Sequence, residues 1–182
     1  MRLCQIDDQC IVATRILGDF MQLAHFTSAR TTAAQVDSEW IRDFVSNFAV
    51  YYPDIDRWFT SKVQPGLTSG SRKILIDVAN GKLNALSILK KSDSERKICT
   101  FWVAPAARGC GVGRRLLTNS IAWLECATPL LTVPEEEIQG FSALLSNARF
   151  RLTQSIPGAY RPGSIEYVFN GSIAARDNSV LQ

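Results

Sequence analysis

The chain has 182 residues, of which 46% are hydrophobic and 20% charged, with a formal net charge of +3. These values are ordinary for a globular protein with one sizeable core. No apolar run approaches the roughly 20 residues that span a bilayer, and the first ten residues include acids where a secretory signal would be apolar. We therefore expect a cytoplasmic protein with no membrane contact.

The cysteines and the histidine exclude several kinds of site. The five cysteines are scattered, and no two of them form a C-x-x-C pair, so neither a disulfide framework nor a zinc site is expected. A single histidine, His25, excludes a mechanism that needs several. The small positive charge does not by itself indicate nucleic acid and suits an anionic ligand equally well. We expect no metal.

Residues 1–36 predict an N-terminal extension that packs on the main domain. Residues 3–6 are expected to form a short strand, and Asp8 is a suitable N-cap for the helix that follows. The apolar stripe of this helix would begin at Val12.

Two more helices are expected before the first long strand. One begins near Asp37 or Ser38, and the other has Asp54 as its N-cap. The pair Pro65-Gly66 is expected to end the second of them.

From Arg72 onward the pattern predicts strands. The runs KILIDVA and LNALSILKK are separated by Asn80-Gly81, a pair typical of two-residue hairpin turns. The run KICTFWVAP is apolar on both faces and predicts a central strand covered on both sides. Strict alternation would place Ile98 and Trp102 on one face, with Phe101 on the other together with Cys99 and Val103.

The last part of the chain alternates helix and strand. A helix is expected from Val112, followed by the short buried strand PLLTV and a helix over about 135–147. The end of the domain predicts two strands joined by a long turn, and residues 172–182 a frayed polar tail.

The loop between the central strand and the next helix is rich in glycine. A helix N-terminus offers unpaired N–H groups and a partial positive charge, and glycines let backbone approach phosphate oxygens. Gly113-Arg114-Arg115 does not match a Walker A ending, and arginine stands where the third glycine of a dinucleotide fingerprint would fall. What remains is Arg-x-x-Gly-x-Gly, with Arg108, Gly111 and Gly113.

This pattern, within VAPAARGCGVGRRLL, resembles the central motif of the GNAT family of N-acetyltransferases. The order of elements from about residue 38 to 171 is similar to the layout of that family. The resemblance implies an acyltransferase domain over 37–171, with an α/β (α+β) fold. Its central sheet would be mixed and mostly antiparallel, with helices on both faces and two splayed strands at the cofactor site.

The resemblance also implies how acetyl-CoA would bind as a cosubstrate. The backbone of Trp102 and Val103 would pair with the pantetheine arm, and the strand around Thr132 would be the splayed neighbour. The pyrophosphate would lie on the backbone amides of the loop. The cofactor-binding set would be Trp102, Val103, Arg108, Gly109, Cys110, Gly111, Val112, Gly113 and Arg114. Cys110 would act through its backbone rather than as a nucleophile.

The chain departs from the family where the general acid is usually found. Leu145 stands at the position of the usual tyrosine, and Glu137 stands near the position of an asparagine. The candidate acids are Tyr160, Ser142 and Ser146. The candidate bases are Glu137, Asp93 and Glu95, of which Asp93 and Glu95 are better explained as the solvated end of a hairpin. The alternative for Tyr160 is packing on the terminal hairpin, and for Glu137 a favourable charge at a helix start. The candidate catalytic residues are therefore Tyr160, Glu137 and Ser146.

The function expected from the resemblance is direct transfer of an acetyl group to a primary amine in a ternary complex. One alternative is a non-catalytic acyl-CoA-binding module. Another is an acetyltransferase for aminoacyl-tRNA, for which the nucleic-acid contact would involve Arg149, Arg151 and Arg161. The terminal hairpin is a plausible surface for a homodimer.

Overall fold

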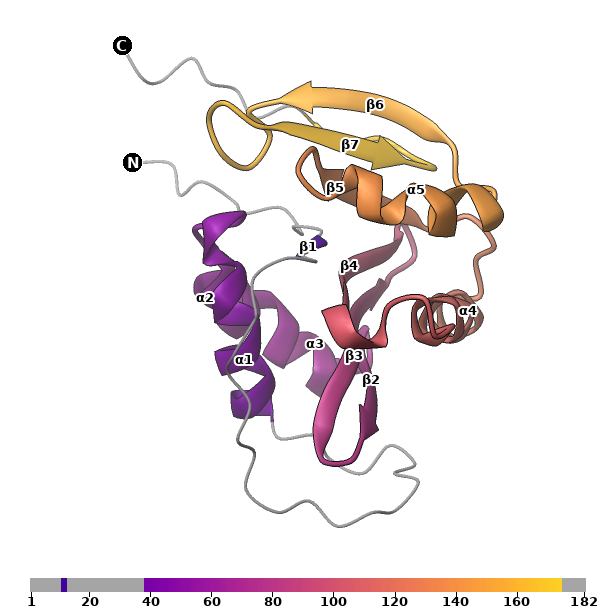
Figure 1. Ribbon diagram of the computed structural model, residues 1–182. Helices are drawn as coiled ribbons and strands as arrows, with labels where there is room; N and C mark the ends of the chain where they lie inside the picture. Colours follow the sequence, from indigo (N-terminus) through magenta and orange to yellow (C-terminus); the bar gives the residue numbers. More distant parts are fainter. Residues whose placement is uncertain (1–10, 13–37, 175–182) are drawn as a thin grey trace.

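The computed structural model describes residues 11–12 and 38–174, and Figure 1 shows how their elements are arranged. One sheet has the strand order β2-β3-β4-β5-β7-β6, and β1 pairs with β4 off this path. The β4–β5 and β1–β4 pairs are parallel and the others antiparallel, which confirms the mixed, mostly antiparallel sheet. The strands are β1 (Ile11–Val12), β2 (Arg72–Ala79), β3 (Lys82–Lys91), β4 (Arg96–Val103), β5 (Leu130–Pro134), β6 (Leu152–Pro157) and β7 (Ile165–Phe169).

Helices cover both faces of the sheet, as expected (Figure 1). On one face lie α1 (Ser38–Ser46), the 3₁₀ turn η1 (Asn47–Val50), α2 (Ile55–Trp58), the π-helical turn η2 (Phe59–Val63) and α3 (Gln64–Ser69). On the other face lie α4 (Val112–Leu124) and α5 (Ile138–Asn147), and the short 3₁₀ turn η3 (Pro105–Ala107) precedes α4. Each face has its own buried apolar core, so the sheet separates two hydrophobic layers.

The helical segment after Asp54 runs further than expected. Pro65 and Gly66 do not end it; α3 continues to Ser69 and ends at Gly70, which has a left-handed φ of 77°. Pro65 is the second residue of α3, and the turn before it, η2, is π-helical. A proline lacks an N–H and disturbs the preceding turn, and a wider turn accommodates that disturbance. The prediction of a stop at Pro65-Gly66 was therefore wrong.

The faces of β4 also differ from strict alternation. Ile98, Phe101 and Val103 face the α4–α5 core, whereas Cys99 and Trp102 face the α1–α3 core. The reason is a bulge, because the partners of neighbouring Ile88 and Leu89 on β3 are Thr100 and Ile98. Cys99 is thus an extra residue on β4, and an extra residue moves every later side chain of the strand to the opposite face of the sheet.

The N-terminal extension can be compared with its prediction at only two positions. Ile11 and Val12 form a strand parallel to β4 rather than part of a helix, so the helical assignment of Val12 was wrong. The backbone edge of β4 supplies hydrogen-bonding groups that an extended segment can use and a helical one cannot. The rest of the predicted extension, and most of the predicted tail, lie outside the described residues.

Among residues 11–12 and 38–174, no helix is long and apolar enough to cross a membrane.

Candidate functional site

The centre of the sheet opens between β4 and β5. The two strands pair at Lys97 with Leu130 and at Ile98 with Leu131. β4 then continues to Val103, and β5 continues to Pro134 along β7 instead. Beyond Ile98 the edge of β4 that faced β5 is therefore released from it. This is the splay that the resemblance implies.

Two hydroxyl groups lie beside this opening without a hydrogen bond of standard geometry in the described part of the chain. They belong to Thr100 on β4 and Thr132 on β5, and both side chains are completely buried. A buried hydroxyl without a partner is costly, because it has lost its water and gained nothing in return. A polar group entering the opening would offer both hydroxyls a partner.

The released edge of β4 also carries β1. Ile11 lies opposite Thr100 and Val12 opposite Phe101, in parallel register, directly after the last pair between β4 and β5. This edge therefore accepts an extended segment as an added strand.

The glycine loop connects the end of β4 to α4. Gly109 and Gly111 have left-handed φ values of 75° and 77°, which favour glycine. Gly111 is the N-cap of α4 and provides no side-chain hydrogen bond to the first turn. The amides of Val112 and its successors belong to that first turn, where a helix has no acceptor of its own. The loop therefore presents backbone donors at the positive end of a 13-residue helix.

The residues in and around the loop differ in their solvent exposure and in their contacts. Arg108 is exposed, and its Nε donates a hydrogen bond of 3.3 Å to the Val103 carbonyl, which ties the loop to the end of β4. Cys110 and Arg114 are exposed. Trp102 is buried, and its ring lies edge-on to Phe44 of α1 at 4.9 Å between centroids. The predicted cofactor-binding residues thus lie together at the open end of β4 and the start of α4.

A second group of residues lies on the α1–α3 side of the sheet, and we call it the tyrosine centre: Tyr51, Tyr52, Glu137, Tyr160 and Glu166. Its first contact joins the Tyr51 hydroxyl to Glu137 Oε1, at 2.8 Å. Glu137 is 1% exposed and immediately precedes α5. Burial, followed by the hydrogen bond to Glu137 and its charge, raises the pKa of Tyr51 to about 12. Tyr51 is therefore a hydrogen-bond donor throughout the neutral range.

The second contact of the tyrosine centre joins Tyr52 to Glu166. The Tyr52 hydroxyl donates to Glu166 Oε1 at 3.1 Å, and both side chains are buried. Burial raises the pKa of Glu166 to about 8, while Thr132, Tyr52 and Lys97 act in the opposite direction. A carboxyl group with such a pKa exchanges a proton near neutral pH, which suits acid–base chemistry.

The loop between β6 and β7 completes the tyrosine centre. The Tyr160 ring lies edge-on to the Tyr52 ring at 5.2 Å. Arg161 forms an ion pair with Glu136, donates to the Ser164 hydroxyl, and lies over the Tyr51 ring at 5.5 Å. Two of the three candidate catalytic residues, Tyr160 and Glu137, are thus each in contact with one member of the Tyr51–Tyr52 pair.

The third candidate, Ser146, lies elsewhere. It is exposed on α5, one position after Leu145, which is buried in the α4–α5 core. Ser142 is also exposed and donates to the Gln139 carbonyl of its own helix. Because α5 covers the opposite core from the Tyr51–Tyr52 pair, the structure does not bring Ser146 together with Tyr160.

Sequence reasoning missed Tyr51, Tyr52 and Glu166. The signal for Glu166 was an acid among apolar residues in the run IEYVF, on the face it shares with Val168 rather than with Tyr167. The two tyrosines stand directly before Pro53, after a helix. Nothing in the sequence pairs them with glutamates 86 and 114 positions away.

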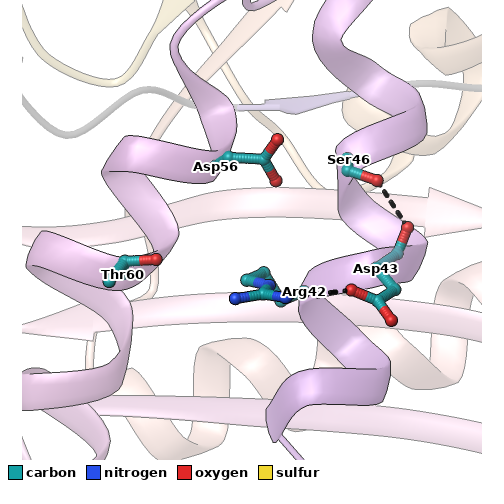
Figure 2. A pocket seen from close by; sticks show the side chains of 5 residues that line it. All are labelled: Arg42, Asp43, Ser46, Asp56 and Thr60. Atoms are coloured by element: carbon teal, nitrogen blue, oxygen red, sulfur yellow. Dashed lines mark hydrogen bonds and ion pairs between the residues drawn. The ribbon is translucent and has the colours of Figure 1, made fainter.

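Figure 2 shows a different depression, on the outer surface of the helical layer. It has a volume of about 320 Å³ and lies between α1 and the segment α2–η2. Its lining residues are Arg42, Asp43, Ser46, Asp56 and Thr60. Arg42 and Asp43 are ion-paired at 3.4 Å, and neither the glycine loop nor the tyrosine centre contributes a residue. Within the described ranges, no group of three or more His, Cys, Asp or Glu side chains could hold a metal ion.

Comparison with known proteins identifies the kind of domain. The sequence matches the model of the acetyltransferase (GNAT) family over residues 34–133. A search of curated protein sequences finds no match.

Solved structures with a similar fold come from acetyltransferases. A GNAT-family protein from Desulfovibrio desulfuricans aligns with 76% of this chain and 93% of its own, at 14% identity and a TM-score of 0.58. An aminoglycoside 6'-N-acetyltransferase complexed with coenzyme A aligns with 72% of this chain and 88% of its own, at 10% identity and a TM-score of 0.52. Nourseothricin acetyltransferase aligns with 56% of this chain and 65% of its own, at 18% identity and a TM-score of 0.51.

Proposed function

The chain belongs to the GNAT acetyltransferase family, and from this premise we propose that it transfers the acetyl group of acetyl-CoA directly to a primary amine. The observation that carries the proposal is the placement of the glycine loop at the released edge of β4. One feature offers donors for a pyrophosphate and the other offers backbone for an extended arm. Their combination suits a ligand with both parts, such as coenzyme A.

Different residues would hold the two parts of the cosubstrate, the pyrophosphate and the pantetheine arm. The amides of Gly109, Cys110, Gly111, Val112, Gly113 and Arg114 would bind the pyrophosphate, with Arg108 at the start of the loop. The backbone of Trp102 and Val103 would pair with the pantetheine arm. Acetyl-CoA, when bound, supplies an acetyl thioester. The unpartnered hydroxyl of Thr100 supports this fit, because a polar arm between the strands would give it a partner.

The proposed arm and β1 would lie on adjoining stretches of the same edge of β4. Ile11 and Val12 pair with Thr100 and Phe101, and these two residues directly precede the backbone assigned to the arm. The two segments would crowd each other where these stretches meet, at Phe101 and Trp102, so we expect Ile11–Val12 to leave this edge, at least in part, when acetyl-CoA binds. This is a competition between two extended segments for space along one strand edge.

The reaction needs a proton donor for the departing thiolate. Tyr160 is our first candidate, because it lies half-buried against Tyr52 on the same side of the sheet as the buried glutamates. Ser146 ranks below it because its side chain is exposed on α5. Glu137 remains a candidate base, although one of its oxygens already accepts a hydrogen bond from Tyr51.

One observation favours a second candidate function. Leu145 is packed in the α4–α5 core at the position where the family usually has its acid tyrosine, which suits a module that binds acyl-CoA without turning it over. Release of coenzyme A thiol from acetyl-CoA, measured over a broad panel of amines, separates the two. Amine-dependent release supports the enzyme. Acetyl-CoA binding without release on any amine supports the module.

A further inference from the structure

Glu166 is a buried carboxyl group in a sheet strand, and its position requires an explanation. It lies opposite Pro134 of β5 and Ile156 of β6 and is 4% exposed. A buried carboxyl group costs free energy unless hydrogen bonds compensate it. An apolar residue would pack here without that cost, as Val168 does two positions later on the same face.

The surroundings of Glu166 contain a second unusual group, Thr132. Thr132 lies opposite Val168 and two positions before Pro134, so its side chain is on the same face of the sheet as Glu166. The Thr132 hydroxyl is near enough to lower the pKa of Glu166, yet it has no hydrogen bond of standard geometry among the described residues. The two observations together place a buried hydroxyl within reach of a buried carboxyl group, in a contact that falls outside standard hydrogen-bond geometry.

The position of Thr132 connects Glu166 to the opening of the sheet. β5 is the strand that separates from β4 after Leu131, and Thr132 is the next residue along it. A group on this residue borders the splay on one side and Glu166 on the other. The hydroxyl can accept a proton from the splay while it donates its own to the carboxylate.

We propose that Glu166 receives the proton of the incoming amine through the Thr132 hydroxyl, and that Tyr52 positions Glu166 for this task. The proposal deepens the proposed function and rests on it. The substrate class it implies is a primary amine that arrives protonated and must lose its proton before it can attack.

The proton balance is as follows. The ammonium group gives one proton to the Thr132 oxygen as the hydroxyl gives its own to Glu166, which leaves a neutral amine with a free electron pair. That pair forms the new N–C bond, and the C–S bond breaks with its electrons on sulfur. The nitrogen then loses a second proton, and the thiolate gains one. The sum is one ammonium and one thioester giving one amide, one thiol and one proton, which Glu166 returns to solvent.

The pH dependence follows from the direction of the Glu166 shift. Its pKa of about 8 means that the carboxyl group is protonated, and cannot accept, below that pH. The groups that face it are Tyr52 and Thr132 with their hydroxyls, Lys97 with a positive charge and Glu136 with a negative one. The rate should therefore rise with pH and level off above about 8.

The test is the pH profile of kcat in the full-length protein with an amine that the wild type acetylates. Glu166→Gln keeps the shape and the acceptor for Tyr52 but cannot take a proton. We expect kcat to fall about 100-fold, in the range for loss of a positioned acid or base, and the rising limb near pH 8 to disappear. Thr132→Val should also lower kcat. Glu95→Gln, the same change on a glutamate that is ion-paired to Lys90 between β3 and β4, should leave the profile unchanged.

Tyr52→Phe supplies a readout that a purely structural role would not move. The Tyr52 hydrogen bond lowers the pKa of Glu166, so its removal should shift the rising limb to higher pH. The assignment of Glu166 is overturned if Glu166→Gln retains the rising limb. If Glu137→Gln then loses the limb, Glu137 is the base instead. In either case wild-type turnover leaves the proposed function standing. Absence of turnover by the wild type on every amine overturns both.

Discussion

The glycine loop and the tyrosine centre lie on the same domain, but the loop offers backbone groups and the centre offers side chains. The loop acts through backbone: Gly109 and Gly111 hold left-handed torsions, and the donors it offers are main-chain amides. The tyrosine centre acts through side chains, with two adjacent tyrosines donating to two buried glutamates. A backbone site leaves a local pattern in the sequence, whereas a side-chain site assembled from distant segments leaves none.

The difference also separates two tasks. The loop and the released edge of β4 are suited to holding a ligand with an anionic head and an extended arm. The tyrosine centre contains two groups whose pKa values are raised, Tyr51 and Glu166. If binding and proton transfer are divided in this way, changes in one region should leave the property of the other intact.

The largest expected effect concerns stability at the tyrosine centre. The folded-state pKa of Glu166, about 8, is higher than its ordinary value of 4.5, so the folded protein retains a proton that the unfolded chain releases between these pH values. Wild-type stability should fall as pH rises through this window. Glu166→Gln should remove that loss, on the order of a few kcal/mol at pH 8 relative to pH 5. Denaturant unfolding of the wild type and of Glu166→Gln at pH 5 and pH 8 measures this change in the free energy of unfolding.

The next effect tests whether Tyr160 belongs to turnover rather than to binding. Tyr160→Phe removes the candidate proton donor and should lower kcat by about 100-fold, at the low end for general acids because a thiolate is a tolerable leaving group. The affinity for acetyl-CoA should not change. Tyr167→Phe is the matched control, because Tyr167 is on β7 but packs against the opposite core. A loss of acetyl-CoA affinity in Tyr160→Phe would break the division between the two regions.

The sequence indicated the first region far better than the second. Gly109, Gly111 and Arg108 are neighbours in the chain and predicted the loop, and Asn80-Gly81 predicted a hairpin whose two turn residues both have positive φ. The bulge at Cys99 was not predictable, because it depends on pairing with β3 rather than on local pattern. Glu166, Tyr52 and Thr132 come from three separate segments, so their meeting depends on the finished sheet.

The smallest expected effect concerns the strand that shares the β4 edge with the proposed arm. Val12→Pro removes a backbone N–H and disfavours strand pairing at β1. One or two lost backbone hydrogen bonds are worth about 1 kcal/mol, so acetyl-CoA should bind roughly 5-fold more tightly. Val12→Ala retains the N–H and should bind like the wild type. Equal affinity in all three proteins would mean that β1 does not compete for this edge.

The most direct test of the central claim is acetyl-CoA binding to Gly111→Val and Gly81→Val, measured by calorimetry. Both glycines have left-handed φ values, 77° and 71°, and an added Cβ would meet nothing closer than 3.6 Å at either position. The two substitutions therefore strain the backbone alike, one at the N-cap of α4 and the other in the turn between β2 and β3. We predict that Gly81→Val binds acetyl-CoA like the wild type and that Gly111→Val does not bind it. Wild-type affinity in Gly111→Val would contradict the assignment of the loop as the pyrophosphate site.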